Sequence, residues 1–223
     1  MTTSIHAPRQ CVLDLPSWGG RRKGAGPKPA MPDRRPALPH RKRAEQRAYH
    51  PVHVTFRMRD HVWNLRSQRA FAVIHGALQA VRRRRDFRIT HFSIQGNHVH
   101  LIVEAEGNRS LSNGVRAFSI RVARGLNGMM GRRGRVFEDR YHAHVLRTPA
   151  EARNAVRYAV GNFESHAARR GKRTSGRWVD PFSSSAAAVP RLGQGVLFPD
   201  PVTSAARTWL LRSAVGERAR GGR

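Results

Sequence analysis

The segment from Phe92 to Glu104 constrains the fold of this chain more than any other, because it predicts a β-hairpin with two chemically different faces. Two apolar-rich runs flank Gly96-Asn97, a two-residue connection with the composition of a hairpin turn. Side chains on a strand alternate between faces, so His98 and His100 must point the same way. Two imidazoles at this spacing on an open sheet face can bind one metal ion together.

Strand pairing across the turn predicts the register of this hairpin. The expected partners are Gln95 with His98, Ile94 with Val99, Ser93 with His100, and Phe92 with Leu101. One face is therefore apolar, and the other carries the two imidazoles beside polar side chains. The same pattern also fits a surface strand that carries two histidines without a metal.

Hydrophobic periodicity predicts the other elements of the central region. Alternation at Val52, Val54 and Phe56 indicates a strand, and a further strand is expected at 141–146. Helical spacing recurs in two apolar stripes, which are Phe71, Ile74, Leu78 and Val81, and then Leu111, Val115, Phe118, Val122 and Leu126.

A third helix has a strong start signal, with Thr148 as N-cap, Pro149 at the first helical position and Glu151 completing a capping box. Its apolar stripe is Ala152, Val156, Ala159, Val160 and Phe163. Tyr158 and Asn162 fall nearly opposite this stripe, one turn apart. A tyrosine phenol is a weak nucleophile because its ordinary pKa is about 10, but a nearby divalent cation lowers that pKa and polarises a phosphate. The alternative is an exposed tyrosine without a catalytic role.

The order β-α-β-β-α-β followed by a helix predicts an α+β chain with a ferredoxin-like sheet. In that topology the first and third strands are central neighbours, and the first two helices cover the apolar side that carries Val99 and Leu101. The histidine face is left for a ligand or for the last helix. His53 has the same outward parity on the adjacent strand, so we expect it near the histidine pair.

The charge of the chain indicates a polyanionic partner. The 223 residues carry a formal net charge of +28, from 42 Lys and Arg against 14 Asp and Glu. The alternative is a solvated basic surface, and the run Arg82–Arg85 also suits the C-terminus of a helix. We expect nucleic-acid contacts from Arg82, Arg83, Arg84, Arg116, Arg121, Arg124 and Arg140.

The expected compartment is the cytoplasm, with association to the nucleoid. The lone Cys11 excludes an intrachain disulfide framework and a multi-cysteine zinc site. No apolar run approaches the ~20 residues that span a bilayer, and no secretory apolar region follows Met1, so we expect no membrane partner. The sequence leaves both a monomer and a dimer open.

Composition divides the chain into three segments. Residues 1–48 form a basic arm rich in Pro, Gly and Arg, which we expect to be disordered. We expect residues 49–170 to form the folded domain that carries the candidate metal and nucleophile residues. Residues 171–223 form a loosely ordered extension, in which an apolar island at 208–211 is expected to dock on the domain or on a ligand.

Three motifs of the central region resemble those of one known family. They are Gly96-Asn-His-Val-His-Leu-Ile-Val-Glu104, Arg135-Val-Phe-Glu-Asp-Arg-Tyr-His142 and Tyr158-Ala-Val-Gly-Asn162. With the order of elements, they resemble the single-tyrosine HUH transposases, and most closely the REP-associated tyrosine transposases (RAYTs). The resemblance covers about residues 50–168, and the basic segment 19–29 is also similar to the N-terminus of that branch.

The resemblance implies metal-dependent cleavage of single-stranded DNA beside hairpins, such as REP-like palindromes. His98 and His100 would hold Mg²⁺ or Mn²⁺, with Asn162 as the third ligand. Tyr158 would attack the scissile phosphorus, form a 5′-phosphotyrosyl link and release a 3′-hydroxyl. A different 3′-hydroxyl would reverse the reaction and join the strands.

Two other functions stay open, namely a non-catalytic DNA-binding protein on the same scaffold and an RNA-binding module. An RNA-binding sheet would carry stacking aromatic side chains on its central strands, where this chain carries His53, His98 and His100. His142-x-His144 is a competing histidine pair, which ranks lower because its strand is expected at an edge of the sheet. Glu104 shares the parity of the first pair and is a weaker ligand candidate.

Overall fold

The computed structural model describes residues 45–169, 179–187 and 202–214. Its strands are β1 (Val52–Arg57), β2 (Phe87–Ile94), β3 (His98–Ala105) and β4 (His142–Val145). Its helices are α1 (Gln68–Arg82), α2 (Asn108–Met129), α3 (Pro149–Arg169), the 3₁₀ turn η1 (Ser184–Ala187) and α4 (Trp209–Ala214). Most of the predicted arm at 1–48 and much of the predicted extension at 171–223 lie outside the described residues. Over the described part of the chain, no helix is long and apolar enough to cross a bilayer.

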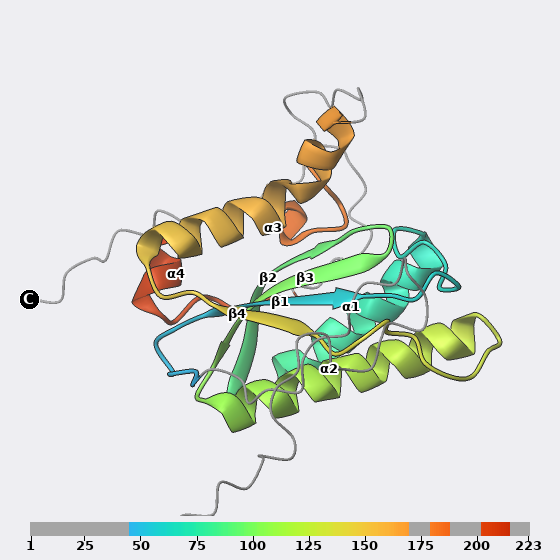
Figure 1. The fold of residues 1–223 in the computed structure, drawn as a ribbon, viewed down its shortest axis with the longest axis horizontal. Helices are drawn as coiled ribbons and strands as arrows, with labels where there is room; N and C mark the ends of the chain where they lie inside the picture. The colour runs from blue at the N-terminus through green and yellow to red at the C-terminus, as the bar shows by residue number, and fades with distance from the viewer. Residues whose placement is uncertain (1–44, 170–178, 188–201, 215–223) are drawn as a thin grey trace, which may run out of the picture. The chain divides into compact units, whose positions relative to one another are not determined.

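The four strands form one antiparallel sheet in the order β2-β3-β1-β4 (Figure 1). On β3, His100 lies opposite Thr55 of β1 and opposite Ser93 of β2. The predicted hairpin register and the predicted central strands are therefore confirmed, as is the α+β ferredoxin-like fold. Strand β4 is one residue shorter at each end than the sequence predicts.

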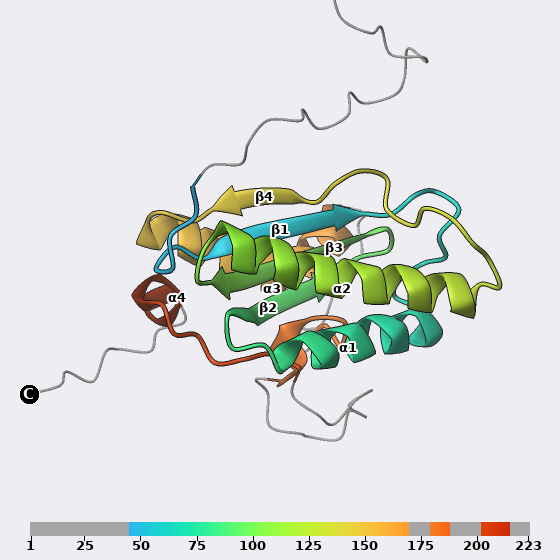
Figure 2. The same ribbon diagram turned by 90° about the horizontal axis from the view of Figure 1, so that it is seen from below.

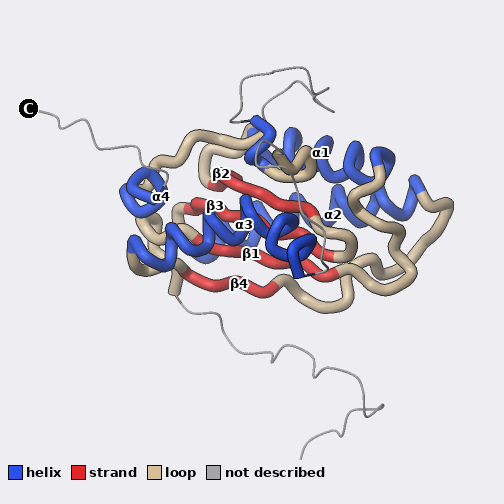
Figure 3. The backbone as a smooth tube through the Cα atoms, turned by 90° about the horizontal axis from the view of Figure 1, so that it is seen from above, coloured by secondary structure: helices blue, strands red, loops and turns tan. Residues whose placement is uncertain are grey.

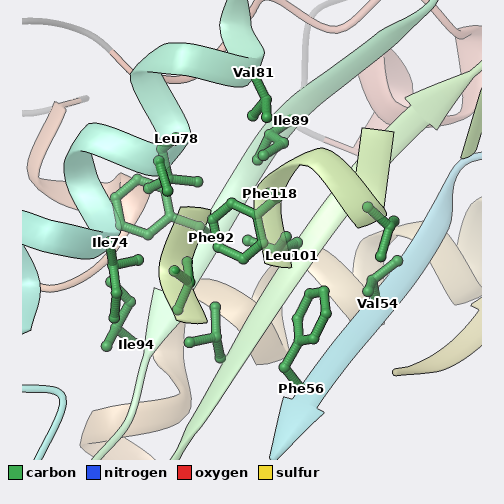
Figure 4. Close-up of a cluster of buried hydrophobic side chains, with 14 of the residues drawn as sticks. Val54, Phe56, Ile74, Leu78, Val81, Ile89, Phe92, Ile94, Leu101 and Phe118 are labelled. Carbon is green, nitrogen blue, oxygen red and sulfur yellow. The ribbon is translucent and has the colours of Figure 1, made fainter. Parts of the chain in front are cut away.

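Helices α1 and α2 lie side by side over the apolar face of the sheet, as predicted (Figures 1 and 2). Val99, Leu101 and Val103 of β3 point into this layer and are fully buried. Figure 4 shows Phe118 of α2 and Leu78 of α1 meeting these strands in one apolar core. Burial of this face therefore sets which side of the sheet carries the histidines.

A β-bulge between Ile89 and His91 changes which residues of β2 face the core. Below the bulge, Ile89 packs in the core and Arg88 lies opposite Glu104 on the other face. A regular strand would send alternate residues from Ser93 to one face, which would expose Ile89 there. The bulge therefore buries Ile89 and pairs Arg88 with a buried carboxylate.

A neighbouring loop holds the tip of the β2–β3 hairpin. Neither Gly96 nor Asn97 has a positive φ, so the turn is not of the primed types that two-residue hairpins favour. The backbone N–H of Met58 donates to the Asn97 carbonyl (2.8 Å), and the N–H of Leu65 donates to the Gly96 carbonyl (2.9 Å). The segment between β1 and α1 therefore fixes the backbone next to His98.

Helix α3 begins as predicted. The Thr148 hydroxyl accepts from the backbone N–H of Glu151 at 3.1 Å. The Glu151 carboxylate in turn accepts from the N–H of Arg147 at 2.7 Å, one residue before the cap position. Thr148 and Glu151 therefore satisfy backbone donors at the start of α3 and define its first turn.

Helix α3 lies across the histidine face, on the side of the sheet away from α1 and α2 (Figures 1 and 3). It packs through small side chains, since Ala152, Ala155 and Ala159 form its buried contact. Leu210 and Leu211 of α4 complete this second apolar cluster, together with Ile102 and Leu146. The apolar island at 208–211 therefore forms part of the surface against which α3 packs.

The buried carboxylate of Glu104 joins α4 to the sheet. It accepts hydrogen bonds from the backbone N–H of Thr208 (2.7 Å) and of Arg207 (3.0 Å), directly before the first residue of α4. It also pairs with Arg88 at 2.8 Å. A carboxylate at a helix N-terminus satisfies free N–H groups and interacts favourably with the helix dipole. Glu104 therefore supports α3 indirectly, through α4.

A second anchor holds α3 near its C-terminal half. Arg66 forms a two-pronged ion pair with the buried Asp180, at 2.7 and 3.0 Å, and donates to the Ile94 carbonyl. Its guanidinium also lies over the rings of Phe163 of α3 (3.8 Å) and Phe182 (4.4 Å). The Ile94 N–H donates to the Phe182 carbonyl, so this segment also covers the edge of β2.

Gly114→Ala should destabilise the protein, because the added methyl group would lie 2.1 Å from Cγ of the fully buried Phe87. We expect a loss of about 1–3 kcal/mol in the free energy of unfolding, the usual cost of overpacking a core. Gly128→Ala on the same helix is the matched control, because no atom lies within 4 Å of the added group. That control should gain up to about 1 kcal/mol in helix propensity. Urea unfolding curves that shift in the same direction would contradict this packing.

Glu104→Gln should reduce stability at neutral pH, and the difference should shrink in acid. Burial raises the pKa of Glu104, but hydrogen bonds from the Thr208 backbone, Arg88 and the Arg207 backbone outweigh burial, so the pKa lies below 4.5. The carboxylate therefore stabilises the fold above about pH 4.5, and this stability is lost as the pH falls through the lowered pKa.

We expect Glu104→Gln to lose about 3 kcal/mol at neutral pH, because Arg88 keeps a charge without its partner. Thermal unfolding of the variant and of the wild type across the acidic range measures the difference. The exposed neighbour Glu106 provides the control substitution to Gln, which should have little effect. A loss for Glu104→Gln that is independent of pH would show that the charge is not what holds α4.

Asp180→Asn should also cost about 3 kcal/mol in the free energy of unfolding, because it breaks a buried pair with Arg66. Asp86→Asn breaks the half-exposed pair with Arg84 and should cost less than about 1 kcal/mol. Chemical denaturation compares the two. Equal losses would show that the Arg66–Asp180 pair is no more than a surface contact.

Candidate metal and nucleophile site

The histidine pair lies on the sheet face that α1 and α2 leave open. His98 and His100 project from β3 to the same side, and their ring centroids lie 4.9 Å apart with the rings nearly perpendicular. His98 is half-buried near the hairpin tip, whereas His100 is buried further along the strand. The two imidazoles thus form one potential binding point with one side toward solvent.

Helix α3 brings Tyr158 over this pair. The Tyr158 ring packs edge-on against His100 at 5.1 Å between centroids and lies 6.0 Å from the ring of His53. The tyrosine is nevertheless 47% exposed, so solvent and a substrate reach it. The structure therefore places a phenol beside the histidines without burying it in the core.

Polar contacts within the sheet orient the two imidazoles. Nδ1 of His100 lies 3.1 Å from Nε2 of His53 and 3.1 Å from the hydroxyl of Thr55. Nδ1 of His98 lies 2.8 Å from the Asn97 side-chain oxygen, which accepts, so this nitrogen carries the proton. In both rings Nδ1 is engaged, and Nε2 is the nitrogen suited to a metal.

His53 stays neutral under physiological conditions. Burial, followed by the nearby His144 and His142, lowers the pKa of His53 to about 4. A neutral imidazole can accept or donate at Nε2, whereas a charged one would repel a bound cation. The sequence places His53 near the pair by parity, but it does not identify Thr55 or Asn97. The outward parity of Thr55 on β1 is the signal that would have found it.

The described side chains supply part of a metal-binding set. Within the described ranges, no group of three His, Cys, Asp or Glu side chains could hold a metal ion. Asn162, the predicted third ligand, lies on α3 one turn after Tyr158, and its side chain lies outside the described residues. Glu104 is engaged by α4 and Arg88, so it does not complete the set. The two imidazoles are chemically suited to a divalent cation, and the described side chains do not complete its set of ligands.

The competing pair His142-x-His144 lies on the edge strand β4 and is exposed. Strand pairing places His142 beside Thr55 and His144 beside His53, so both imidazoles share the open face. They flank the site from the side that α3 does not cover.

The arginines that the sequence predicts to contact nucleic acid lie either beside β4 or in the layer of α1 and α2. Arg140 is exposed and lies two residues before the start of β4. Arg84 pairs with Asp86 at 2.8 Å. The others are exposed on the helical layer behind the sheet and comprise Arg82 and Arg83 near the end of α1 and Arg116, Arg121 and Arg124 on α2.

Comparison with solved structures shows which folds this chain resembles. A structure described as "the REP associates tyrosine transposase bound to a REP hairpin" is 20% identical and has a TM-score of 0.52, covering 76% of this chain and 96% of that chain. A candidate transposase from Deinococcus radiodurans R1 is 11% identical with a TM-score of 0.38, covering 60% of this chain and 100% of that chain, and carries no weight here. No curated protein matches in sequence.

A family model supplies the assignment. The model of IS200-like transposases matches residues 44–162, which include both histidines of β3, Tyr158 and Asn162. This agrees with the resemblance to tyrosine transposases that the sequence motifs carry and with the shared RAYT fold. The match extends over more than half of the chain, and the chain belongs to the IS200-like transposase family.

Proposed function

We propose that this protein cleaves and rejoins single-stranded DNA beside a hairpin, through a 5′-phosphotyrosyl intermediate on Tyr158. One observation supports the proposal above all others, namely that the exposed Tyr158 ring lies against the buried His100 of the histidine pair. A nucleophile must reach the reacting atom, and positioning supplies a large part of the rate. An exposed phenol held beside a potential cation site meets this requirement.

The cation would be Mg²⁺ or Mn²⁺. His98 and His100 would hold it, and Asn162 would be the third ligand. When bound, it supplies positive charge to the oxygens of the scissile phosphate. Neutral imidazoles are weaker ligands for a hard cation than carboxylates, so the DNA phosphate would contribute to its binding.

The chain's own residues then account for each step. The Tyr158 oxygen attacks the scissile phosphorus and forms a new O–P bond, while its proton passes to solvent. The bond from phosphorus to the 3′ oxygen breaks, and that oxygen takes up a proton to become a 3′-hydroxyl. A 3′-hydroxyl from another strand then attacks the phosphotyrosine, which restores the phenol and joins the two strands. No external energy source is needed, because one phosphodiester replaces another.

The charge distribution suits a DNA substrate with a hairpin. Arg140 is exposed just before β4, the strand next to β1, whereas Arg82, Arg83, Arg116, Arg121 and Arg124 lie on the helical layer and would meet DNA only away from Tyr158. Backbone phosphates of a stem that leaves the site are suitable partners for these guanidinium groups. A related fold has been described in complex with a REP hairpin, which makes REP-like palindromes the first candidates. Such a protein would act at the nucleoid.

Tyr158→Phe should abolish a covalent adduct with DNA. A hairpin oligonucleotide with single-stranded flanks is labelled at its 3′ end, because the retained fragment carries the 5′ phosphate. The wild type with Mg²⁺ or Mn²⁺ should form a labelled protein band on a denaturing gel, and a chelator should remove it. His100→Ala should slow its formation by about a hundredfold or more, since charge stabilisation at the phosphate is worth several kcal/mol.

Tyr49→Phe is the matched control, because Tyr49 is also exposed and contacts Arg47 and His50 rather than the pair His98 and His100. It should form the adduct at the wild-type rate. If the Tyr158→Phe variant still formed the adduct, Tyr158 would not be the nucleophile. DNA binding without an adduct, for every palindrome found beside the encoding gene, would favour the non-catalytic DNA-binding protein.

A further inference from the structure

We propose that the exposed edge strand β4 binds the backbone of the single-stranded DNA through His142 and His144 and leads it to Tyr158. The inference rests on the proposed function and adds the path of the substrate. It assigns a role to the second histidine pair, which the catalytic centre does not use.

Burial identifies the open side of the histidine face. On β3 the residues of this face are buried from His100 to Glu104, under α3 and α4. No described residue of β4 belongs to that covered cluster, and Leu146, directly after the strand, joins it. His142 and His144 are exposed, and β4 lies along the margin of the sheet, clear of α3 (Figure 3). A strand of DNA therefore reaches the site most directly across β4.

Because side chains alternate between the two faces of a strand, the two histidines of β4 lie on this open side of the sheet. Ala143 and Val145 face the core under the sheet, whereas His142 and His144 face the other way. Alternate residues of a strand lie about 6.6 Å apart, similar to the spacing of successive phosphates in an extended single strand. An imidazole N–H can donate to a phosphate oxygen, so the two rings can meet consecutive phosphates.

The surrounding charges favour a polyanion on β4. Arg140 is exposed just before the strand, and Arg147 is exposed just after it. Three carboxylates lie near the strand, and each is engaged locally. Glu138 pairs with Arg57 at 2.6 Å, Asp139 accepts from the backbone N–H of Arg140 at 2.7 Å, and Glu151 caps α3. Exposed guanidinium groups therefore flank the strand at both ends.

Strand β4 also runs alongside the histidine pair, with only β1 between them in the sheet. His144 lies beside His53 in the sheet, and the His53 ring lies 6.0 Å from Tyr158. His142 lies beside Thr55, which contacts His100. A backbone that follows β4 therefore passes beside the histidine pair and the phenol, one strand away across β1.

The test measures DNA affinity separately from chemistry. In the Tyr158→Phe background, fluorescence anisotropy with Mg²⁺ compares a hairpin with a single-stranded flank and the same stem-loop without it. Adding His142→Ala and His144→Ala should weaken binding of the flanked hairpin by about tenfold, because each lost contact to a charged group is worth roughly 1 kcal/mol or more. Binding of the bare stem-loop should stay unchanged. In the chain with Tyr158 intact, the DNA concentration for half-maximal adduct rate should rise, while the rate at saturation stays within about twofold.

Two further variants keep the result specific. His142→Arg with His144→Arg keeps donors for phosphate and should retain the affinity for the flank, which a purely structural role would not predict. Arg85→Ala with Arg109→Ala removes two exposed charges from the helical layer and should affect both DNAs equally. Photo-crosslinking of a flank carrying 5-iodouracil should label the tryptic peptide 141–147.

Suppose that the parent forms the adduct but the double alanine variant binds the flanked hairpin with unchanged affinity. That result would overturn the path along β4 and leave the proposed function standing. Equal losses for both DNAs, or a loss confined to the rate at saturation, would overturn it as well. Absence of the adduct in the parent would instead count against the nuclease function. The binding comparison would still report on β4 in that case.

Discussion

Strand β3 carries apolar side chains on one face and histidines on the other, and the rest of the structure depends on that separation. Its residues alternate between Val99, Leu101 and Val103, which are buried under α1 and α2, and His98 and His100, which face the other side. A slip of one residue in its pairing with β1 would place imidazoles in the apolar core. The free energy of burying the apolar face therefore also holds the two histidines on the open face of the sheet, beside Tyr158.

The position of the phenol depends on residues far away in the sequence. Helix α3 contacts the sheet through alanines, which bury little area each, so α4 and the Arg66 anchor contribute much of its fixation. Glu104 on the histidine strand caps α4, and Asp180 holds Arg66 against Phe163. In the proposed reaction small displacements of the phenol would cost large factors in rate, so these anchors would serve the chemistry as well as the stability.

Polar groups around the site set the orientation of the imidazoles rather than only filling space. His53 and Thr55 both contact Nδ1 of His100, and Asn97 fixes the proton on Nδ1 of His98. The turn that carries Asn97 is in turn held by Met58 and Leu65. Outer contacts of this kind decide which nitrogen faces a cation, so the site extends well beyond the ring pair.

Patterns of short range in the sequence determined the hairpin register, the apolar stripes of α1 and α2, the capped start of α3 and the order of elements, because alternation and helical periodicity are local properties of the chain. Parity also placed His53 near His100. Only the tertiary structure decided the bulge at Ile89, the docking of Asp180, the partners of the apolar island at 208–211, and the contact of Tyr158 with His100. Those features depend on packing between segments separated by up to about a hundred residues, and no local pattern encodes the partner that each segment meets.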